Sequence, residues 1–403
     1  MAREQASEPC ELLRPEECPV KLPRYVRVNL LKTTRERVLQ HFVDAGFERI
    51  SQVPGDGIGE GQWVAPDKDL HDLVVFPPGT NVLSSRLVLD GAVRLQDKSS
   101  CFPAHVLAVE PGWDVADACA APGNKTTHVS SLMSGSNNVF AFEKDRKRAD
   151  LLRETVRQQG ACNVHVSCGS FLDTDPSDPK FSNVRGILVD PSCSGSGMVT
   201  RLDGLVDAGG PQNKAEENER LARLATFQTR VLIHALSFPG VCRVVYSTCS
   251  VHAAENECVV EAVRKQCADA FEVERVLPDW PHRGDRVGAY GDRCVRSGPA
   301  DLTSGFFVAA FVRKHYAKLK GSPKTAESRG SANHSEEPGG DRKRKDDEDV
   351  ATTLTTTTTS GERAVHSSLA WRMVTSGVGF GRWRASCDNI AYRFRKRLRA
   401  TES

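Results

Sequence analysis

Three apolar runs, each followed by a polar loop that carries one cysteine, constrain the fold of this chain more than any other feature. The runs have the length of single strands, and each loop begins where the apolar character stops. The carboxyl ends of parallel strands meet at one edge of a sheet, so three such loops predict a ligand-binding crevice. The three segments are residues 114–126, 187–197 and 244–250.

The stretch that contains these segments predicts an α/β domain over residues 101–314. Apolar strands alternate there with helices, which is typical of a parallel sheet covered on both faces. The last strand is apolar on both sides, and this predicts burial. We expect strands near 114–118, 139–143, 164–167, 185–190, 241–247, 272–276 and 306–312, and helices near 124–133, 146–159, 216–237 and 253–266.

The segments on either side of this domain differ from it in composition. Residues 23–100 predict a small α+β part, with strands over 23–29 and 73–76 and a helix over 34–45. Residues 1–22 are polar and predict a loose arm. Residues 315–403 are rich in Ser, Glu, Lys and Gly and cannot bury enough apolar surface to offset chain entropy, so we expect a mostly disordered tail.

Composition excludes several classes of protein. Lys and Arg number 54 against 52 Asp and Glu, so any nucleic-acid surface must come from local clustering. The 13 cysteines form no Cys-x-x-Cys pair, which argues against a zinc ribbon or a thioredoxin motif, and no metal is expected. Their odd number suits a reducing compartment. The sequence contains no run of about 18 apolar residues, so we expect no membrane span.

The loop over residues 117–126 joins a strand to a helix. Its alanines and Gly123 allow a ligand to approach backbone amides, and the helix that opens at Asn124 favours a negative group at its start. A loop with one glycine is equally compatible with a plain strand–helix turn.

Two acidic side chains follow other strands of the predicted sheet. Glu143 comes directly after the second strand, where a carboxylate can accept hydrogen bonds from both ribose hydroxyls of an adenosine. Alternatively, Glu143 stabilises the start of the next helix. Asp190 ends a buried strand, where a carboxylate is costly unless it is paired or used. The alternative for Asp190 is a capping role.

Taken together, three strings resemble the RNA cytosine-5 methyltransferases of the Nol/Nop/Sun-domain (NSUN) family. They are Asp-Ala-Cys-Ala-Ala-Pro-Gly-Asn-Lys-Thr at 117–126, Asp-Pro-Ser-Cys at 190–193 and Tyr-Ser-Thr-Cys-Ser at 246–250. The resemblance spans about residues 23–314. Residues 192–198, 281–284 and 304–307 look most like the type-five members, which are nucleolar enzymes that methylate large-subunit ribosomal RNA.

This resemblance implies a Rossmann-like methyltransferase that uses S-adenosyl-L-methionine. It implies that the thiolate of Cys249 adds to carbon 6 of the target cytosine, that Cys193 assists release of the product and that Asp190 orients the base. Having both cysteines points to RNA rather than DNA. Ser170 stands where the family usually has an acid that meets the adenine. The implied cofactor contacts are Cys119, Ala120, Ala121, Pro122, Gly123, Asn124, Lys125, Glu143, Ser170 and Asp190.

The expected partner is RNA, with ribosomal RNA as the substrate. Arg24, Arg27, Lys32 and Arg35 cluster beside Tyr25, and they form either a phosphate-tracking strip or an ordinary solvated face. The helical RNA-binding domain that the family usually places before this point is missing, which predicts weak RNA binding.

The expected location is the nucleus and nucleolus, and the expected state is a monomer with no membrane contact. Arg342–Lys345 is either a nuclear address or a solubilising charge run. Two rival functions remain open: a tRNA cytosine-5 methyltransferase, and a non-catalytic RNA-binding factor of ribosome assembly that has kept the fold.

Overall fold

The computed structural model describes residues 21–53, 61–198 and 214–321, and two β-sheets organise this part of the chain. The predicted arm over 1–22 and the predicted tail over 315–403 lie largely outside the described residues, as does the segment Arg342–Lys345. Among the described helices, none is both long enough and apolar enough to cross a membrane.

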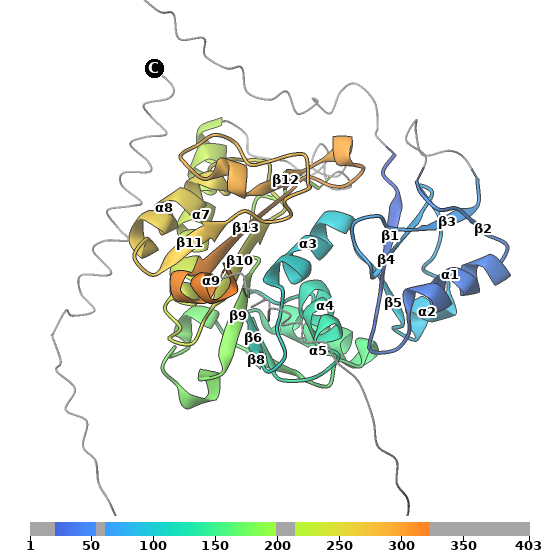
Figure 1. The fold of residues 1–403 in the computed structure, drawn as a ribbon, viewed down its shortest axis with the longest axis horizontal. Helices are drawn as coiled ribbons and strands as arrows, with labels where there is room; N and C mark the ends of the chain where they lie inside the picture. The colour runs from blue at the N-terminus through green and yellow to red at the C-terminus, as the bar shows by residue number, and fades with distance from the viewer. Residues whose placement is uncertain (1–20, 54–60, 199–213, 322–403) are drawn as a thin grey trace, which may run out of the picture. The chain divides into compact units, whose positions relative to one another are not determined.

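A five-stranded sheet in the order β2-β3-β4-β1-β5 forms the N-terminal part of the fold (Figure 1). Val26 and Phe76 from this sheet pack with Phe42 of the first helix in one buried cluster. That helix starts after Thr34, whose side chain accepts a hydrogen bond from the backbone N–H of Arg37. The elements are β1 (Arg24–Val28), α1 (Arg35–Asp44), β2 (Glu48–Arg49), β3 (Trp63–Pro66), β4 (Leu73–Phe76), α2 (Arg86–Leu89) and β5 (Val93–Leu95).

An eight-stranded sheet follows, in the order β11-β13-β10-β9-β6-β7-β8, with β12 paired to β13. The chain leaves β6 toward β7 on one side and later returns to place β9 on the other, so the strand order reverses between β6 and β9. Ligands of open α/β sheets bind at such a reversal. The elements are α3 (Lys98–Leu107), β6 (Asp114–Asp117), α4 (Asn124–Leu132), β7 (Val139–Glu143), α5 (Arg146–Gln159), β8 (Val164–Cys168), β9 (Val184–Val189), α7 (Lys214–Leu236), β10 (Arg243–Thr248), α8 (Glu257–Cys267), β11 (Phe271–Glu274), β12 (Val295–Ser297), β13 (Phe306–Arg313) and α9 (Lys314–Gly321), with short 3-10 turns at Phe171–Asp173, Pro179–Phe181, Gly291–Arg293 and Pro299–Asp301.

The expectation of an all-parallel sheet is wrong at one end. β6, β7, β8, β9 and β10 are parallel, but β13 runs antiparallel to β10, and β11 and β12 run antiparallel to β13. The connection between β12 and β13 is too short for a crossover, so the two strands form an antiparallel pair. As expected, β13 is buried along almost its whole length.

Helices cover both faces of the large sheet, and alternate residues of its strands separate the two layers. Val244 and Tyr246 pack into the cluster that contains residues of α7 and α8, whereas Val245 packs into the cluster that contains residues of α3 and α4. Figure 1 shows α7 and α8 on one side of the sheet and α3 and α4 on the other, with the N-terminal sheet beyond α4. The α/β fold class, with a small α+β part ahead of it, is therefore confirmed.

Arg27 is not the phosphate-binding residue that the sequence predicted. Its side chain is fully buried between the N-terminal sheet and helices α4 and α5, where its guanidinium donates to the carbonyl of Asn124 at 2.8 Å, to Thr127 Oγ1 at 3.1 Å and to Gln159 Oε1 at 3.2 Å. Burial lowers its pKa to about 10, so it stays charged at neutral pH. Arg27 therefore fastens β1 to the start of α4 and the end of α5.

Candidate active site

A cavity of about 460 Å³ opens at the carboxyl ends of β6, β7, β9 and β10. Its volume lies within the range of small-molecule sites, which is about 300–1,000 Å³. The cavity therefore lies at the predicted edge of the sheet. The sequence-predicted residues that line it are Cys119, Ala121, Glu143, Ser170, Asp190, Cys193 and Cys249.

Two thiols lie in contact at one end of this cavity. Cys249 directly follows β10, Cys193 lies in the loop after β9, and their Sγ atoms are 3.1 Å apart with both cysteines free. The hydrogen bond from Cys193 holds the pKa of the Cys249 thiol below its ordinary value, and it raises the pKa of Cys193. The opposite directions of the two pKa shifts favour Cys249 over Cys193 as the thiol that loses its proton first.

Lys125 lies beside this pair rather than in the wall of the cavity. Its Nζ is 2.8 Å from Asp190 Oδ2, and Asp190 Oδ1 accepts a hydrogen bond of 2.6 Å from Ser247 Oγ. Burial alone would lower the pKa of Lys125, but Asp190 and Cys249 raise it above its ordinary value. The ammonium in turn lowers the pKa of Cys249. Lys125, predicted from the sequence as a cofactor contact, is thus placed to act on the thiolate.

The glycine loop contributes less to the cavity than the sequence suggested. Cys119 and Ala121 line the cavity, but Ala120, Pro122, Gly123 and Asn124 are not part of its wall. Gly123 adopts a positive φ of 104°, and a Cβ there would lie 2.9 Å from Leu152 of α5. The glycine therefore permits close packing of two helices rather than approach of a ligand. The Asn124 side chain instead accepts a hydrogen bond from Arg94.

Glu143 is a buried carboxylate in the wall of the cavity. Its Oε1 accepts a hydrogen bond of 2.9 Å from the backbone N–H of Asp145, and its Oε2 lies 3.4 Å from the guanidinium of Arg148. Asp145, rather than Glu143, caps α5. Because the capping role belongs to Asp145, the carboxylate of Glu143 has acceptor capacity left for a ligand in the cavity.

Ser170 caps a turn and also faces the cavity. Its side chain accepts a hydrogen bond from the backbone N–H of Leu172 and caps a 3-10 turn, and it also lines the cavity. The hydroxyl proton is not used in that cap and can be donated to a ligand.

The far wall of the cavity comes from residues that the sequence did not single out. Phe227 and Val231 of α7 face the cavity, and Lys144 Nζ lies 5.5 Å from the centre of the Phe227 ring. Arg148 of α5 also lines the cavity, and it donates to the carbonyl of Ala121 at 2.9 Å. None of these residues belongs to a recognisable motif. Their place follows from how two helices pack on the sheet.

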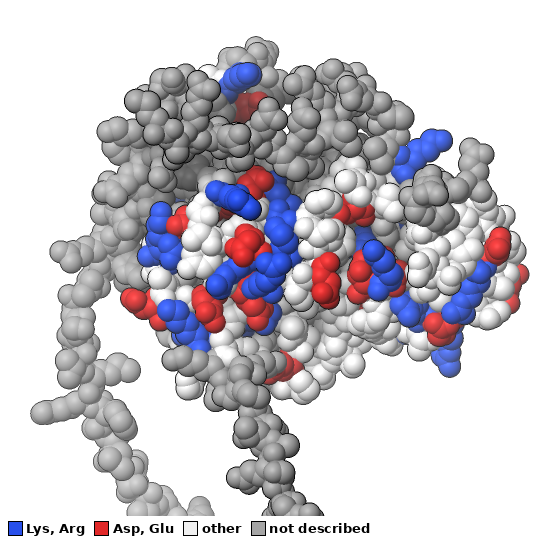
Figure 2. All heavy atoms as spheres, turned by 45° about the horizontal axis from the view of Figure 1, so that its top comes forward, with Lys and Arg blue, Asp and Glu red and all other residues white. Residues whose placement is uncertain are grey.

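The remaining basic residues of the predicted strip are only partly available to RNA. The amine of Lys32 donates to the backbone carbonyls of Asp90 at 2.6 Å and Gln158 at 2.7 Å, so it joins α2 to α5. Arg24 and Arg35 are half-exposed. Figure 2 shows Lys and Arg side chains interleaved with Asp and Glu on one face of the described part, with no field of a single sign.

One group of side chains in the described ranges has the composition of a metal site. His71, Asp72 and His105 place potential ligand atoms within 4.8 Å of one another, away from the cavity. Both oxygens of Asp72 are already hydrogen-bonded, at 2.8 Å to His105 Nε2 and at 2.6 Å to His128 Nε2. These contacts explain the cluster as a link from β4 to α3 and α4.

Comparison with sequence families gives two matches that follow one another along the chain. The ferredoxin-like domain of NOL1/NOP2/Sun domain family member 5 matches residues 22–96, and the 16S rRNA methyltransferase RsmB/F family matches residues 104–312. The first match covers the N-terminal sheet, and the second covers the large sheet with its cavity.

Several curated proteins are similar over most of this chain. The 25S rRNA (cytosine-C(5))-methyltransferase NSUN5 of Arabidopsis thaliana is 41% identical over 76% of this chain and 51% of its own length. The 28S rRNA (cytosine-C(5))-methyltransferase of Mus musculus is 42% identical over 73% of this chain and 63% of its own length. The chain thus spans about half to two thirds of the length of these relatives.

Solved structures support the same fold. A methyltransferase homologue from Pyrococcus horikoshii is 27% identical and superposes with a TM-score of 0.54 over 73% of this chain and 87% of its own. NSun6 from the same organism, solved with SFG, is 19% identical, with a TM-score of 0.52 over 73% of this chain and 92% of its own. The second likeness concerns the fold alone.

Proposed function

This chain belongs to the NOL1/NOP2/Sun-domain methyltransferase family, next to its member 5, and from this we propose that it methylates carbon 5 of a cytosine in large-subunit ribosomal RNA. The substrate is inferred from the relatives from Arabidopsis and mouse, whose names specify 25S and 28S rRNA. Because this chain spans only part of those relatives, the activity requires its own test.

The observation that carries the proposal is the pair of unlike thiols beside a lysine and an aspartate. Carbon 5 of cytosine is a poor nucleophile until a thiolate adds to carbon 6 and turns the ring into an enamine. Cys249 is the thiolate, held by Cys193 and by the charge of Lys125. This is covalent catalysis that divides one difficult step into easier ones.

Each residue of this group has its own role in the proposed reaction. Addition of Cys249 Sγ to carbon 6 moves the ring's electron pair toward carbon 5, the atom that receives the methyl group. Transfer of the carbon 5 proton to a water molecule restores the double bond and expels the thiolate of Cys249. Cys193, 3.1 Å away, supplies the hydrogen bond that stabilises the departing thiolate. We assign Asp190, anchored by Ser247 and Lys125, to orientation of the base.

S-adenosylmethionine fits the cavity by its chemistry, and when bound it supplies an electrophilic methyl group. Glu143 would accept hydrogen bonds from the ribose hydroxyls, and Ser170 would face the adenine. Cys119, Ala121 and the α7 residue Phe227 would enclose the rest of the molecule. Ala120, Pro122, Gly123 and Asn124 would then act by shaping the loop rather than by contact.

Arg24 and Arg35 are proposed as RNA contacts without Arg27, which is buried, and without Lys32, whose exposed amine is held by two backbone carbonyls. We further propose that the protein acts as a monomer in the nucleolus, where ribosomal RNA is made and modified.

Methyl transfer to purified RNA tests the function directly. The chain, incubated with isotopically labelled S-adenosylmethionine, should label large-subunit ribosomal RNA stripped of protein and should not label tRNA. Preferential labelling of tRNA would replace the proposed substrate. Absence of labelling in any RNA, together with intact cofactor binding, would favour the non-catalytic assembly factor.

A further inference from the structure

Two consecutive polar residues, Glu255 and Asn256, are completely buried immediately before α8. The sequence predicted that the helix would already have begun at residue 253, but Asn256 has φ −110° and ψ −99°, outside the helical range. A buried carboxylate or carboxamide needs hydrogen-bond partners to offset its loss of water. The partners of these two side chains lie on the two cysteine loops.

Glu255 holds the loop of Cys193 from both sides. Its carboxylate accepts the backbone N–H of Ser194 at 3.0 and 3.3 Å, and it accepts Gln228 Nε2 at 2.9 Å. The same Gln228 amide donates to the carbonyl of Ser192 at 3.1 Å. The peptide groups before and after Cys193 are thus fixed by one carboxylate and one carboxamide.

Asn256 holds the loop of Cys249 in the same manner. Its Oδ1 accepts the hydroxyl of Thr248 at 2.5 Å, and its Nδ2 donates to the carbonyl of Ser250 at 2.8 Å. Both neighbours of Cys249 are therefore fixed by a single carboxamide. Residues 255 and 256 share a peptide bond. The loop of Cys193 and the loop of Cys249 are therefore held by two neighbouring residues of one short segment.

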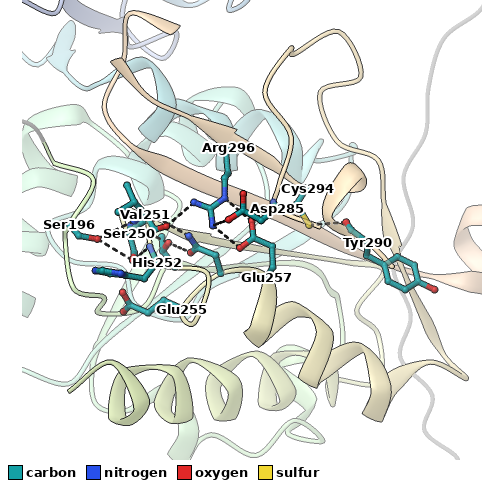
Figure 3. A network of polar contacts seen from close by, with 12 residues as sticks. Ser196, Ser250, Val251, His252, Glu255, Glu257, Asp285, Tyr290, Cys294 and Arg296 are labelled. Carbon is teal, nitrogen blue, oxygen red and sulfur yellow. Dashed lines mark hydrogen bonds and ion pairs between the residues drawn. The ribbon is translucent and has the colours of Figure 1, made fainter. Parts of the chain in front are cut away.

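The segment of Glu255 and Asn256 is itself bonded to the rest of the domain. The hydroxyl of Tyr246, in β10, donates to the carbonyl of Glu255. Glu257, the next residue, forms two hydrogen bonds of 2.7 Å with the guanidinium of Arg296, which also donates to the carbonyl of Val251 at 2.8 Å. Figure 3 shows the Arg296 side chain reaching between Glu257 and the loop after Cys249.

We propose that Glu255 and Asn256 are positioning residues that set the distance between the sulfur atoms of Cys193 and Cys249. Neither residue lines the cavity, and their hydrogen bonds reach the residues on either side of the two cysteines. The inference extends the proposed function, because that reaction needs both thiols at one cytosine, Cys249 to attack carbon 6 and Cys193 to assist release of the product.

The distance can be probed without methyl transfer. Phenylarsine oxide condenses with two neighbouring thiols, forming two arsenic–sulfur bonds and releasing one water. Both cysteines line the cavity, so a small reagent can reach them. We expect wild-type protein to form a bridged adduct in which mass spectrometry links the peptides of Cys193 and Cys249, and Cys193→Ser to lose it.

Two isosteric variants separate positioning from folding. Asn256→Asp keeps the acceptor for Thr248 but cannot donate to Ser250. Glu255→Gln removes the charge and places an NH₂ group at one of the two oxygens that face the N–H of Ser194. We expect each to weaken formation of the arsenic bridge by about tenfold or more, and to lower kcat on ribosomal RNA by about tenfold to a hundredfold. KM for RNA and affinity for S-adenosylmethionine should change less than about twofold.

The matched control is Glu272→Gln, an exposed carboxylate on β11 that should leave every readout unchanged. The proposal is overturned if both variants bridge arsenic and turn over like the wild type. It is also overturned if kcat falls while arsenic bridging does not. If the wild type forms the bridge, and Asn256→Asp weakens it, in a protein that methylates no RNA, the positioning role stands and the proposed function fails.

Discussion

The contact between Cys193 and Cys249 lowers the pKa of Cys249 and raises the pKa of Cys193, and we assign the two thiols different tasks on that basis. Cys249→Ala should abolish methylation and any covalent complex with RNA, since the nucleophile is gone. Cys193→Ala should let a covalent complex accumulate, because Lys125 still supports the thiolate while release is slowed. A denaturing gel of protein incubated with RNA and cofactor distinguishes the two. A complex formed by Cys249→Ala but not by Cys193→Ala would reverse the assignment.

Lys125 should set the pH at which Cys249 becomes reactive. The thiolate is the nucleophilic form, and the pKa of Cys249 is lowered, so its alkylation should rise with pH at lower values than for an ordinary thiol. The hydrogen bond from Cys193 is the main cause of this shift and Lys125 is a further one, so Lys125→Gln should move the curve to higher pH.

The measurement is the rate of iodoacetamide labelling of Cys249 across pH, read by mass spectrometry. Lys147→Gln, an exposed lysine on α5, is the matched control and should leave the curve in place. A curve for Lys125→Gln that overlays the wild type would show that the ammonium does not act on the thiolate.

Glu143 should contribute to cofactor affinity through its free acceptor capacity. A hydrogen bond to a charged group contributes about 1.5–3 kcal/mol, so Glu143→Ala should raise the Kd for S-adenosylmethionine by about tenfold to a hundredfold. Glu143→Asp should retain part of the affinity. Isothermal calorimetry measures both, with Glu272→Gln as control. A Kd for Glu143→Ala within twofold of the wild type would remove the ribose role.

At the scale of elements, Arg27 links the N-terminal sheet to the helices beside the cavity. Arg27→Met keeps the apolar stem but leaves three buried acceptors on α4 and α5 without their donor. We expect the free energy of unfolding to fall by about 2–4 kcal/mol in urea titrations. Arg24→Met, at a half-exposed position of the same strand, should change it by less than about 0.5 kcal/mol. Equal effects of the two variants would contradict the assigned role of Arg27.

Strand ends were predictable from the sequence because apolar runs and polar loops alternate there without ambiguity. The ends of β6, β7, β9 and β10 therefore brought Glu143, Asp190, Cys193 and Cys249 to one cavity as expected. The direction of β13 was not predictable, because a buried apolar strand has the same sequence pattern in a parallel and in an antiparallel pair.

The prediction that Arg27 of β1 contacts RNA failed for a different reason. Tyr25, Arg27 and Asn29 alternate with valines, which is typical of a strand with one solvated face. Here the polar face packs on α4, α5 and the loop that carries Leu302, and its side chains satisfy backbone groups there. Such an interface between a sheet and two helices has no signature within either segment. Similarly, the α7 wall of the cavity depends on packing between elements that are distant in the sequence.

At the scale of the whole molecule, the near balance of charges gives no net positive charge that would attract RNA as a whole. The sequence carries a net charge of only +2, and the face in Figure 2 mixes both signs. The proposed methylation of one cytosine therefore relies on local contacts. The relatives from Arabidopsis and mouse are longer than this chain, so the decisive question is whether these residues suffice for methylation.

Bisulfite sequencing of large-subunit ribosomal RNA answers that question at single-nucleotide resolution. Unmethylated RNA should be incubated with S-adenosylmethionine and either the wild-type chain or Cys249→Ala. We predict that one cytosine resists conversion with the wild type and converts fully with Cys249→Ala. Complete conversion of every cytosine in both samples, with cofactor binding confirmed by calorimetry, would contradict the account.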